Sequence, residues 1–175
     1  DLDSLALLPR KDWHSGFWQH WQPGECGAHE MLEIFCDSAI NGYKLQRNLP
    51  DRTGTSKLSP HLHFGEISVH QIWRKISSMK ISEAQNEDVK HYFSELGWRE
   101  FSYHLLHHFP QSSDHNLNPK FDYFNWAKPD PLLLEKFKRG QTGVPIIDAG
   151  MRELWHTGWM HNRVRMIVAS FLCKN

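Results

Sequence analysis

The chain has 175 residues, which is enough for one domain with a sizeable core. Its 20 basic and 20 acidic residues cancel, so overall charge predicts no nucleic-acid partner and leaves room only for a local basic patch. Three cysteines without metal-ligand spacing argue against a disulfide framework, and the lack of a secretory signal or an apolar run of roughly 18 residues argues against a membrane span. We therefore expect a protein of the cytoplasm.

Residues 1–24 read as a connector rich in tryptophan. From Ala28 to Tyr43, apolar residues recur at helical spacing, which predicts a helix. The polar residues 44–62 predict a loop. Ser68 and Ser82 are expected to cap two helices, the second of which reaches about Phe109 with Gly97 as a weak point.

A second loop is expected over residues 110–129. Asp130-Pro131 predicts the start of a helix that Gly140 ends, and Pro145 to His156 predicts another, which Gly158 ends. A last helix is expected from about Trp159, apolar enough to lie in a core. No segment shows sustained strand alternation, so the predicted fold class is all-α.

Residues 53–60, TGTSKLSP, place four hydroxyl groups and a glycine around one lysine. Closely spaced N–H and O–H donors suit a phosphate. The spacing is not that of a P-loop, and an ordinary Ser/Thr-rich turn is the alternative.

Residues 95–100, ELGWRE, place Glu95 and Arg99 four positions apart on one helix face, with Trp98 beside them. An aromatic plate next to a carboxylate and a guanidinium can hold a flat polar ligand. The alternative is a surface ion pair.

Residues 157–166, TGWMHNRVRM, place polar side chains at the start of the last predicted helix. Asn162, Arg165 and Met166 share a face by their spacing. Asn can address the edge of a heteroaromatic ring, and Arg can serve an anion. The segment predicts one wall of a ligand pocket, with a solvated first helical turn as the alternative.

Histidine pairs such as His104 and His108 raise the question of a metal site. No third ligand is evident at that pair, and HExxH and zinc spacings are absent. We therefore predict no metal ion.

Five of these segments, in order, resemble the FAD-binding domain of the photolyase/cryptochrome family: TGTSKLSPHLHFGEIS, ELGWREF, FNWAKPD, RGQTGVPIIDAGMREL and TGWMHNRVRMIVASFL. The resemblance runs from about Ala28 to Asn175 and implies an all-helical fold that holds FAD without a covalent bond. It implies repair of cyclobutane pyrimidine dimers in UV-damaged DNA, by one electron that passes from light-excited reduced FAD to the dimer and then returns.

By motif position, the resemblance assigns FAD contacts to Tyr43, Thr55, Ser56, Lys57, Leu58, Ser59, Tyr92, Arg99 and Arg165. Lys57 stands where the family commonly has Arg, and Tyr92 where it usually has Trp. The contacts to the lesion and DNA are assigned to Arg47, Glu95, Trp98, Asn162, Arg163 and Met166. Trp126 matches the surface end of the tryptophan chain that photoreduces the flavin.

Trp98 favours a cyclobutane-dimer photolyase, because plant cryptochromes lack that Trp, whereas MHNR is common to both groups. The 6–4 photolyases and animal cryptochromes carry an HHLARH-like pattern instead. Cryptochromes of the DASH type resemble this motif less well, because His161 is present here. A blue-light photoreceptor of the cryptochrome type remains the alternative function.

The chain begins without Met and ends inside a predicted helix, so we expect a piece of a longer protein. Residues 1–27 would connect it to an N-terminal domain with a second, antenna chromophore, and residues 28–175 would form part of the FAD-binding domain. We expect a monomer with no membrane partner, and the third alternative is that this piece is inactive by itself.

Overall fold

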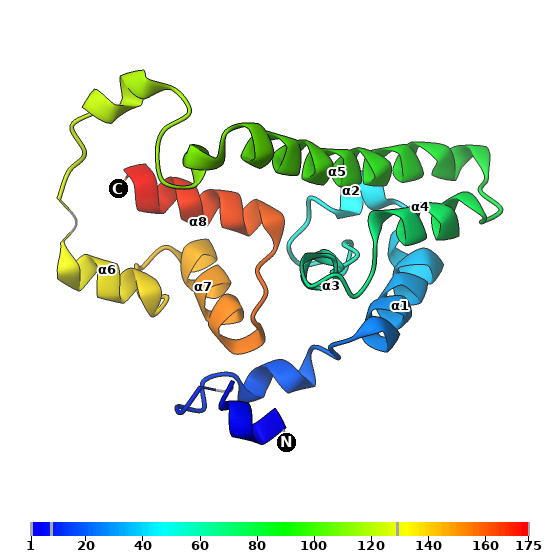
Figure 1. Ribbon diagram of the computed structural model, residues 1–175, viewed down its shortest axis with the longest axis horizontal. Helices are drawn as coiled ribbons and strands as arrows, with labels where there is room; N and C mark the ends of the chain where they lie inside the picture. Colours follow the sequence, from blue (N-terminus) through cyan, green and yellow to red (C-terminus); the bar gives the residue numbers. More distant parts are fainter. Residues whose placement is uncertain (1, 8, 129, 175) are drawn as a thin grey trace. The chain divides into compact units, whose positions relative to one another are not determined.

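The computed structural model describes residues 2–7, 9–128 and 130–174; Asp1 and Asn175, at the ends of the predicted segments, lie outside the described residues. Throughout that part of the chain the regular elements are all helices, which confirms the predicted all-α class (Figure 1). None of these helices is long and apolar enough to cross a membrane. The helices form two compact units: residues 24–128, and residues 1–23 together with 129–175.

The unit over residues 24–128 opens with α1 (Glu25–Ile34), the π-helical turn η3 (Phe35–Ala39) and α2 (Tyr43–Gln46). The prediction of one helix from Ala28 to Tyr43 is wrong at this point. The N–H of Ile40 donates to the carbonyl of Phe35 at 2.9 Å, five residues back, and Gly42 then breaks the helix in the left-handed region at φ 80°.

The same unit continues with α3 (Ser59–His63), α4 (Val69–Ser77) and α5 (Glu83–His108). Ser68 caps α4 as predicted: its Oγ accepts the N–H of Gln71 at 3.2 Å, and its own N–H donates to the Gln71 side chain at 2.8 Å. The N–H of Ser82 donates to Gln85 at 2.9 Å at the start of α5, which runs unbroken through Gly97.

The two predicted loops are partly helical. The end of α2 and all but the last residue of α3 fall within residues 44–62, and the 3-10 turns η4 (Pro110–Ser113) and η5 (Pro119–Tyr123) fall within residues 110–129. The core of this unit is a set of buried apolar residues from α1 to α5: Ala28, Leu32, Phe35, Cys36, Ala39, Ile40, Tyr43, Leu58, Ile67, Ile72, Ile76, Val89, Tyr92 and Leu96.

The other unit contains the 3-10 turns η1 (Leu2–Leu5) and η2 (Ser15–Gln19), then α6 (Pro131–Lys138), α7 (Pro145–Thr157) and α8 (Asn162–Lys174). Asp130 caps α6 by accepting the N–H of Leu132 at 2.8 Å, and Gly158 ends α7, both as predicted. The N-terminal segment packs on α7, where the Trp21 indole donates to the Thr157 carbonyl at 2.6 Å.

The core of this unit consists of Phe137, Ile147, Met160, Val164 and Val168. Helices α7 and α8 approach closely, since a Cβ at Gly150 would lie 2.3 Å from Val164 Cγ1. The prediction that the last helix is buried is wrong in extent. One edge of α8 packs through Val164 and Val168, whereas Leu172 is 54% exposed.

Candidate functional site

Helix α2 lies against α5 (Figure 1). A stripe of polar and aromatic side chains runs along one face of α5. The stripe consists of Asp88, Tyr92, Glu95 and Arg99, spaced by three or four residues so that each stands about one turn beyond the last. The family resemblance singled out the last three of these residues. The structure brings Tyr92 and Glu95 together with Tyr43 on α2 and Arg47 at its C-terminal end.

Tyr43 and Tyr92 form an aromatic pair between α2 and α5, with ring centroids 5.3 Å apart and planes at 89°. Phe35 packs against Tyr92 at 4.5 Å. Burial raises the pKa of Tyr43 to about 12 and raises that of Tyr92 further. Both phenols are therefore neutral at physiological pH, and the pair offers an apolar platform with hydroxyl groups.

Two buried polar atoms on the stripe have no hydrogen-bond partner among the described residues. Arg99 donates through Nη2 to the carbonyl of Leu62 at 3.1 Å, but its buried Nε has no hydrogen-bond partner within the described part of the chain. Ser56 lies near enough to the Tyr92 hydroxyl to lower its pKa slightly against the effect of burial, yet the two groups do not reach ordinary hydrogen-bond geometry. Unpaired buried donors of this kind suit a ligand oxygen.

Residues 53–58 belong to the segment that joins α2 to α3, and Ser59 is the first residue of α3. Ser56 Oγ accepts the N–H of Leu58 at 3.4 Å, and Leu58 is buried at 1% exposure. Lys57 adopts a left-handed backbone at φ 53°, which a residue with a Cβ occupies only at a cost of about 1–2 kcal/mol. Leu58 thus anchors the loop, while the half-buried Thr55, Ser56 and Lys57 lie between core and solvent.

Glu95 pairs with Arg47 across the α2–α5 contact. The Arg47 side chain is 17% exposed, and its guanidinium lies 5.5 Å from the Tyr43 ring centroid. The alternative of an ion pair between Glu95 and Arg99 is not what forms, because Arg99 turns to the Leu62 carbonyl and to the Tyr103 ring at 4.5 Å. Two residues that the resemblance assigns to DNA and to the lesion therefore satisfy each other here.

The two candidate tryptophans of this unit are exposed. Trp98, three residues beyond Glu95, is 62% exposed and meets Phe101 edge to face at 5.8 Å. Trp126 is 59% exposed and lies 4.6 Å from Phe124. Each presents an indole face that a planar partner can reach.

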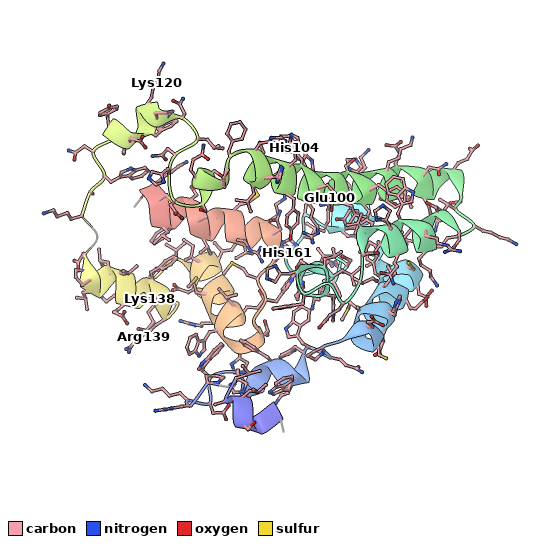
Figure 2. All side chains as sticks on the ribbon, in the orientation of Figure 1. Glu100, His104, Lys120, Lys138, Arg139 and His161 are labelled. Carbon is pink, nitrogen blue, oxygen red and sulfur yellow. The ribbon has the colours of Figure 1, made fainter. Side chains whose placement is uncertain are left out.

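The start of α8 carries the remaining candidates. His161, labelled in Figure 2, is buried, and its Nδ1 accepts the N–H of Arg163 at 3.2 Å, so it caps the helix. Arg165 donates to the carbonyl of Met160 at 3.2 Å. Asn162, Arg163 and Met166 are exposed, so the polar helix start needs no burial of charge.

Two acidic residues with structural roles had not been singled out from the sequence. Asp148 accepts the N–H and hydroxyl of Thr142 at 2.7 and 2.6 Å and the N–H of Gly143 at 3.0 Å, and these bonds hold its pKa below the usual range. Asp88 caps α2 from α5. Its place on the stripe, one turn before Tyr92, was the available signal.

Comparison with known proteins finds similarity to DNA photolyases. Residues 92–175 match the family model described as the FAD binding domain of DNA photolyase. The chain is 48% identical over 175 residues to the deoxyribodipyrimidine photo-lyase of Agrobacterium fabrum, covering 99% of this chain and 36% of that protein. A solved bacterial class III photolyase from Agrobacterium tumefaciens superposes with a TM-score of 0.92 at 47% identity, over 99% of this chain and 36% of that one.

The chain belongs to the photolyase/cryptochrome family. Cryptochrome-1 of Arabidopsis thaliana is a further relative, 36% identical over 88% of this chain and 23% of its own length. The chain spans about a third of the length of the curated photolyases it matches.

Proposed function

We propose that the protein carrying this chain is a deoxyribodipyrimidine photo-lyase, which splits cyclobutane pyrimidine dimers in UV-damaged DNA by light-driven electron transfer from reduced FAD. The observation that carries the proposal is on α5. The Glu95 carboxylate lies one helical turn beyond Tyr92 of the buried Tyr43–Tyr92 pair, and the exposed Trp98 indole lies one turn beyond Glu95. The higher identity to photo-lyases than to cryptochromes supports it.

The residues of the α2–α5 contact fit FAD. An unpaired Arg99 Nε suits a diphosphate oxygen, and the Tyr92 and Ser56 hydroxyls supply further polar contacts beside an aromatic platform. FAD, when bound and reduced, supplies the electron that splits the dimer under light. The full set proposed to hold it is Tyr43, Thr55, Ser56, Lys57, Leu58, Ser59, Tyr92, Arg99 and Arg165.

The protein groups proposed to act on DNA do so by position and polarity. The Glu95 carboxylate accepts hydrogen bonds from a flipped-out base, and the Trp98 indole stacks on it. Asn162 and Met166 complete the proposed lesion contacts, while Arg47 and Arg163 meet phosphates. Trp126, exposed at the surface, is proposed as the outer member of the chain that reduces the flavin.

Three further parts of the proposal concern the whole protein. An antenna chromophore would bind outside this chain. A monomer suffices, since the residues proposed for FAD and the lesion belong to one chain. Cys26, Cys36 and Cys173 are free thiols, which supports a reducing compartment such as the cytoplasm.

A cryptochrome-type photoreceptor is the second candidate function, favoured by the 36% identity to Arabidopsis Cryptochrome-1. It would bind partners in a light-dependent way without splitting dimers.

The two candidates separate in one experiment on the full-length protein. Flavin content is read from absorbance, and repair of a thymine-dimer oligonucleotide is then followed under blue light after chemical reduction. Dimer splitting that needs both light and reduced flavin is expected. Bound flavin without repair in reduced, illuminated samples would reject the photo-lyase and favour the photoreceptor, and absence of flavin would reject both.

A further inference from the structure

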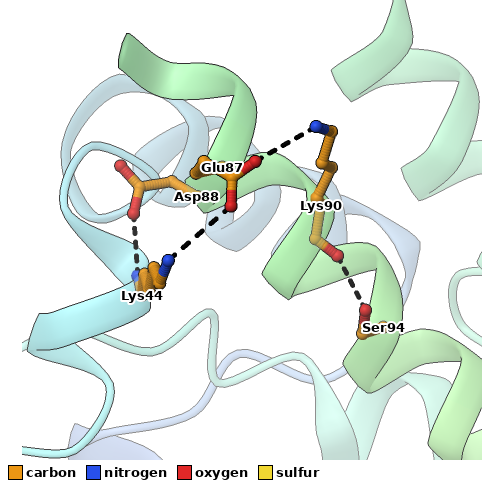
Figure 3. Close-up of polar contacts among 5 residues, drawn as sticks. All are labelled: Lys44, Glu87, Asp88, Lys90 and Ser94. Carbon is orange, nitrogen blue, oxygen red and sulfur yellow. Dashed lines mark hydrogen bonds and ion pairs between the residues drawn. The ribbon is translucent and has the colours of Figure 1, made fainter.

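Asp88 on α5 caps the first turn of α2 (Figure 3). Its Oδ2 accepts the N–H of Gly42 at 2.8 Å, and its Oδ1 accepts the N–H of Lys44 at 2.8 Å. The residue at the N-cap position of α2 is Gly42, which has no side chain to offer. The cap therefore comes from a carboxylate 46 positions away in the sequence.

Helix α2 depends on contacts of this kind. It has four residues, far fewer than the roughly 12–15 that an isolated helix needs to persist in water. The leading N–H groups of a helix have no partner within it, and a carboxylate at that end also interacts favourably with the helix dipole. Asp88 supplies both effects at once.

The two N–H groups that Asp88 binds flank Tyr43. The first N–H lies in the Asn41–Gly42 peptide and the second in the Tyr43–Lys44 peptide, so Asp88 restrains the backbone before and after Tyr43, and with it the position of the ring that packs on Tyr92. One turn further on, the Glu95–Arg47 pair joins the same two helices. The Glu95–Arg47 pair joins two side chains. Asp88 instead binds backbone N–H groups at the start of α2, and so sets the register of α2 on α5.

We infer that Asp88 is a positioning residue: by capping α2 it places Tyr43 and Arg47 for the cofactor and for DNA. The inference rests on the proposed function, because it assigns Asp88 a part in forming the FAD site without contact to FAD. Nothing in the motif that carries the family resemblance includes this residue.

The test compares Asp88→Ala with Glu87→Ala in the full-length protein. Glu87 is the adjacent carboxylate, and its ion-pair partners are exposed lysine side chains, those of Lys44 at 3.6 Å and Lys90 at 3.1 Å, rather than the backbone of α2 (Figure 3). Hydrogen exchange of residues 43–47 is measured in cofactor-free protein, and the FAD dissociation constant by fluorescence titration. D88A is expected to speed exchange in α2 and to weaken FAD binding about tenfold, whereas E87A changes neither.

Two further variants separate positioning from loss of stability. Asp88→Asn keeps one acceptor oxygen and is expected to fall between wild type and D88A, which covers the case that D88A does not fold. Ser68→Ala removes a cap of similar strength from α4 and should lower stability while FAD binding stays at the wild-type level.

The outcomes are distinct. Wild-type FAD affinity in D88A or D88N overturns the inference, as does an equal loss in S68A or E87A. A wild-type protein that takes up no FAD rejects the proposed function and this inference with it, whereas FAD bound equally by wild type and D88N rejects the inference alone.

Discussion

Arg47 and Glu95 form an ion pair with each other in the protein without ligand. A base that donates a hydrogen bond to the Glu95 carboxylate has to share or replace the guanidinium that already faces it. Both side chains are at most about a third exposed, so the pair is only partly screened by water. A ligand that offers a poor partner therefore leaves a charge unsatisfied, which favours discrimination over affinity.

Replacing Glu95 by Gln is expected to lower dimer repair about tenfold or more while FAD content stays unchanged. Hydrogen bonds to a charged group contribute about 1.5–3 kcal/mol, and the amide also donates where the base requires an acceptor. Repair rate per bound flavin is the measurement. Glu100→Gln removes a charge from the exposed side of the same helix and should repair like wild type (Figure 2). Normal repair in E95Q contradicts the role assigned to Glu95.

Asp148 gives the unit that contains α7 a dependence on pH. Its pKa is lowered, chiefly by the hydrogen bond from the Thr142 hydroxyl. The stabilisation is therefore fully present above the unfolded-state pKa, near 3.9, and is lost as the pH falls through the lower folded-state value. Asp148→Asn is expected to lower the urea midpoint at pH 7 and to remove this acid-side loss. A pH profile of the variant that parallels wild type would contradict it.

The sequence predicted which residues share one face of α5, but it did not predict which side chains or backbone groups they contact. Tyr92, Glu95 and Arg99 were identified by motif position, and their spacing put them on one face. The partners of Glu95 and of the α2 backbone could not be read, because 48 and 46 residues separate them and no local pattern specifies which helix packs on which.

Helix α5 and helix α7 each contain a glycine at an interior position, with opposite surroundings. A Cβ at Gly97 would meet nothing within 4 Å, whereas a Cβ at Gly150 would lie 2.3 Å from Val164 Cγ1. The first glycine is a weak point of an exposed helix face. The second permits the close approach of α7 and α8.

The same substitution should therefore change stability in opposite directions at the two sites. Gly97→Ala is expected to raise the free energy of unfolding by about 0.5–1 kcal/mol through helix propensity. Gly150→Ala should lower it by about 1–3 kcal/mol, because the added methyl overpacks against α8. Urea titration of both variants measures the difference. A stabilising Gly150→Ala would show that α8 can shift freely, against the packing described.

Helix boundaries were predictable where a local signal sets them. Ser68, Asp130 and Gly158 cap or end helices because of their own side-chain oxygen or left-handed backbone, which needs no tertiary partner. The short helices α2 and α3 were missed for the converse reason. The segment 44–62 is polar and rich in turn formers, and contacts from α5 hold both helices: Asp88 binds the backbone of α2, and Arg99 binds the Leu62 carbonyl of α3.

The chain as a whole carries balanced charge, so the DNA binding proposed for it has to come from the positions of individual arginines. Arg47 is engaged with Glu95, whereas the Arg163 side chain is exposed at the start of α8. DNA binding by such a surface releases counterions only at a few contacts. Its salt dependence should accordingly be modest.

Arg163→Ala is expected to weaken binding of lesion-containing DNA and to reduce the slope of log K against log salt by about one. Binding curves at several salt concentrations measure both. Arg139→Ala is the matched control, an exposed arginine at the end of α6 (Figure 2). An unchanged slope in R163A would exclude a phosphate contact at this position.

The π turn at Phe35–Ala39 contains one residue more than an α-helical turn, because the Ile40 N–H donates to the Phe35 carbonyl five residues back. An α-helix turns by about 100° per residue, so the extra residue rotates everything that follows relative to α1. Asp37 and Ser38 are exposed, while Phe35, Cys36 and Ala39 stay in the core. We expect relatives that are one residue shorter here to carry a plain α-helix, with the deletion at this solvent-facing pair and the buried residues still in alignment.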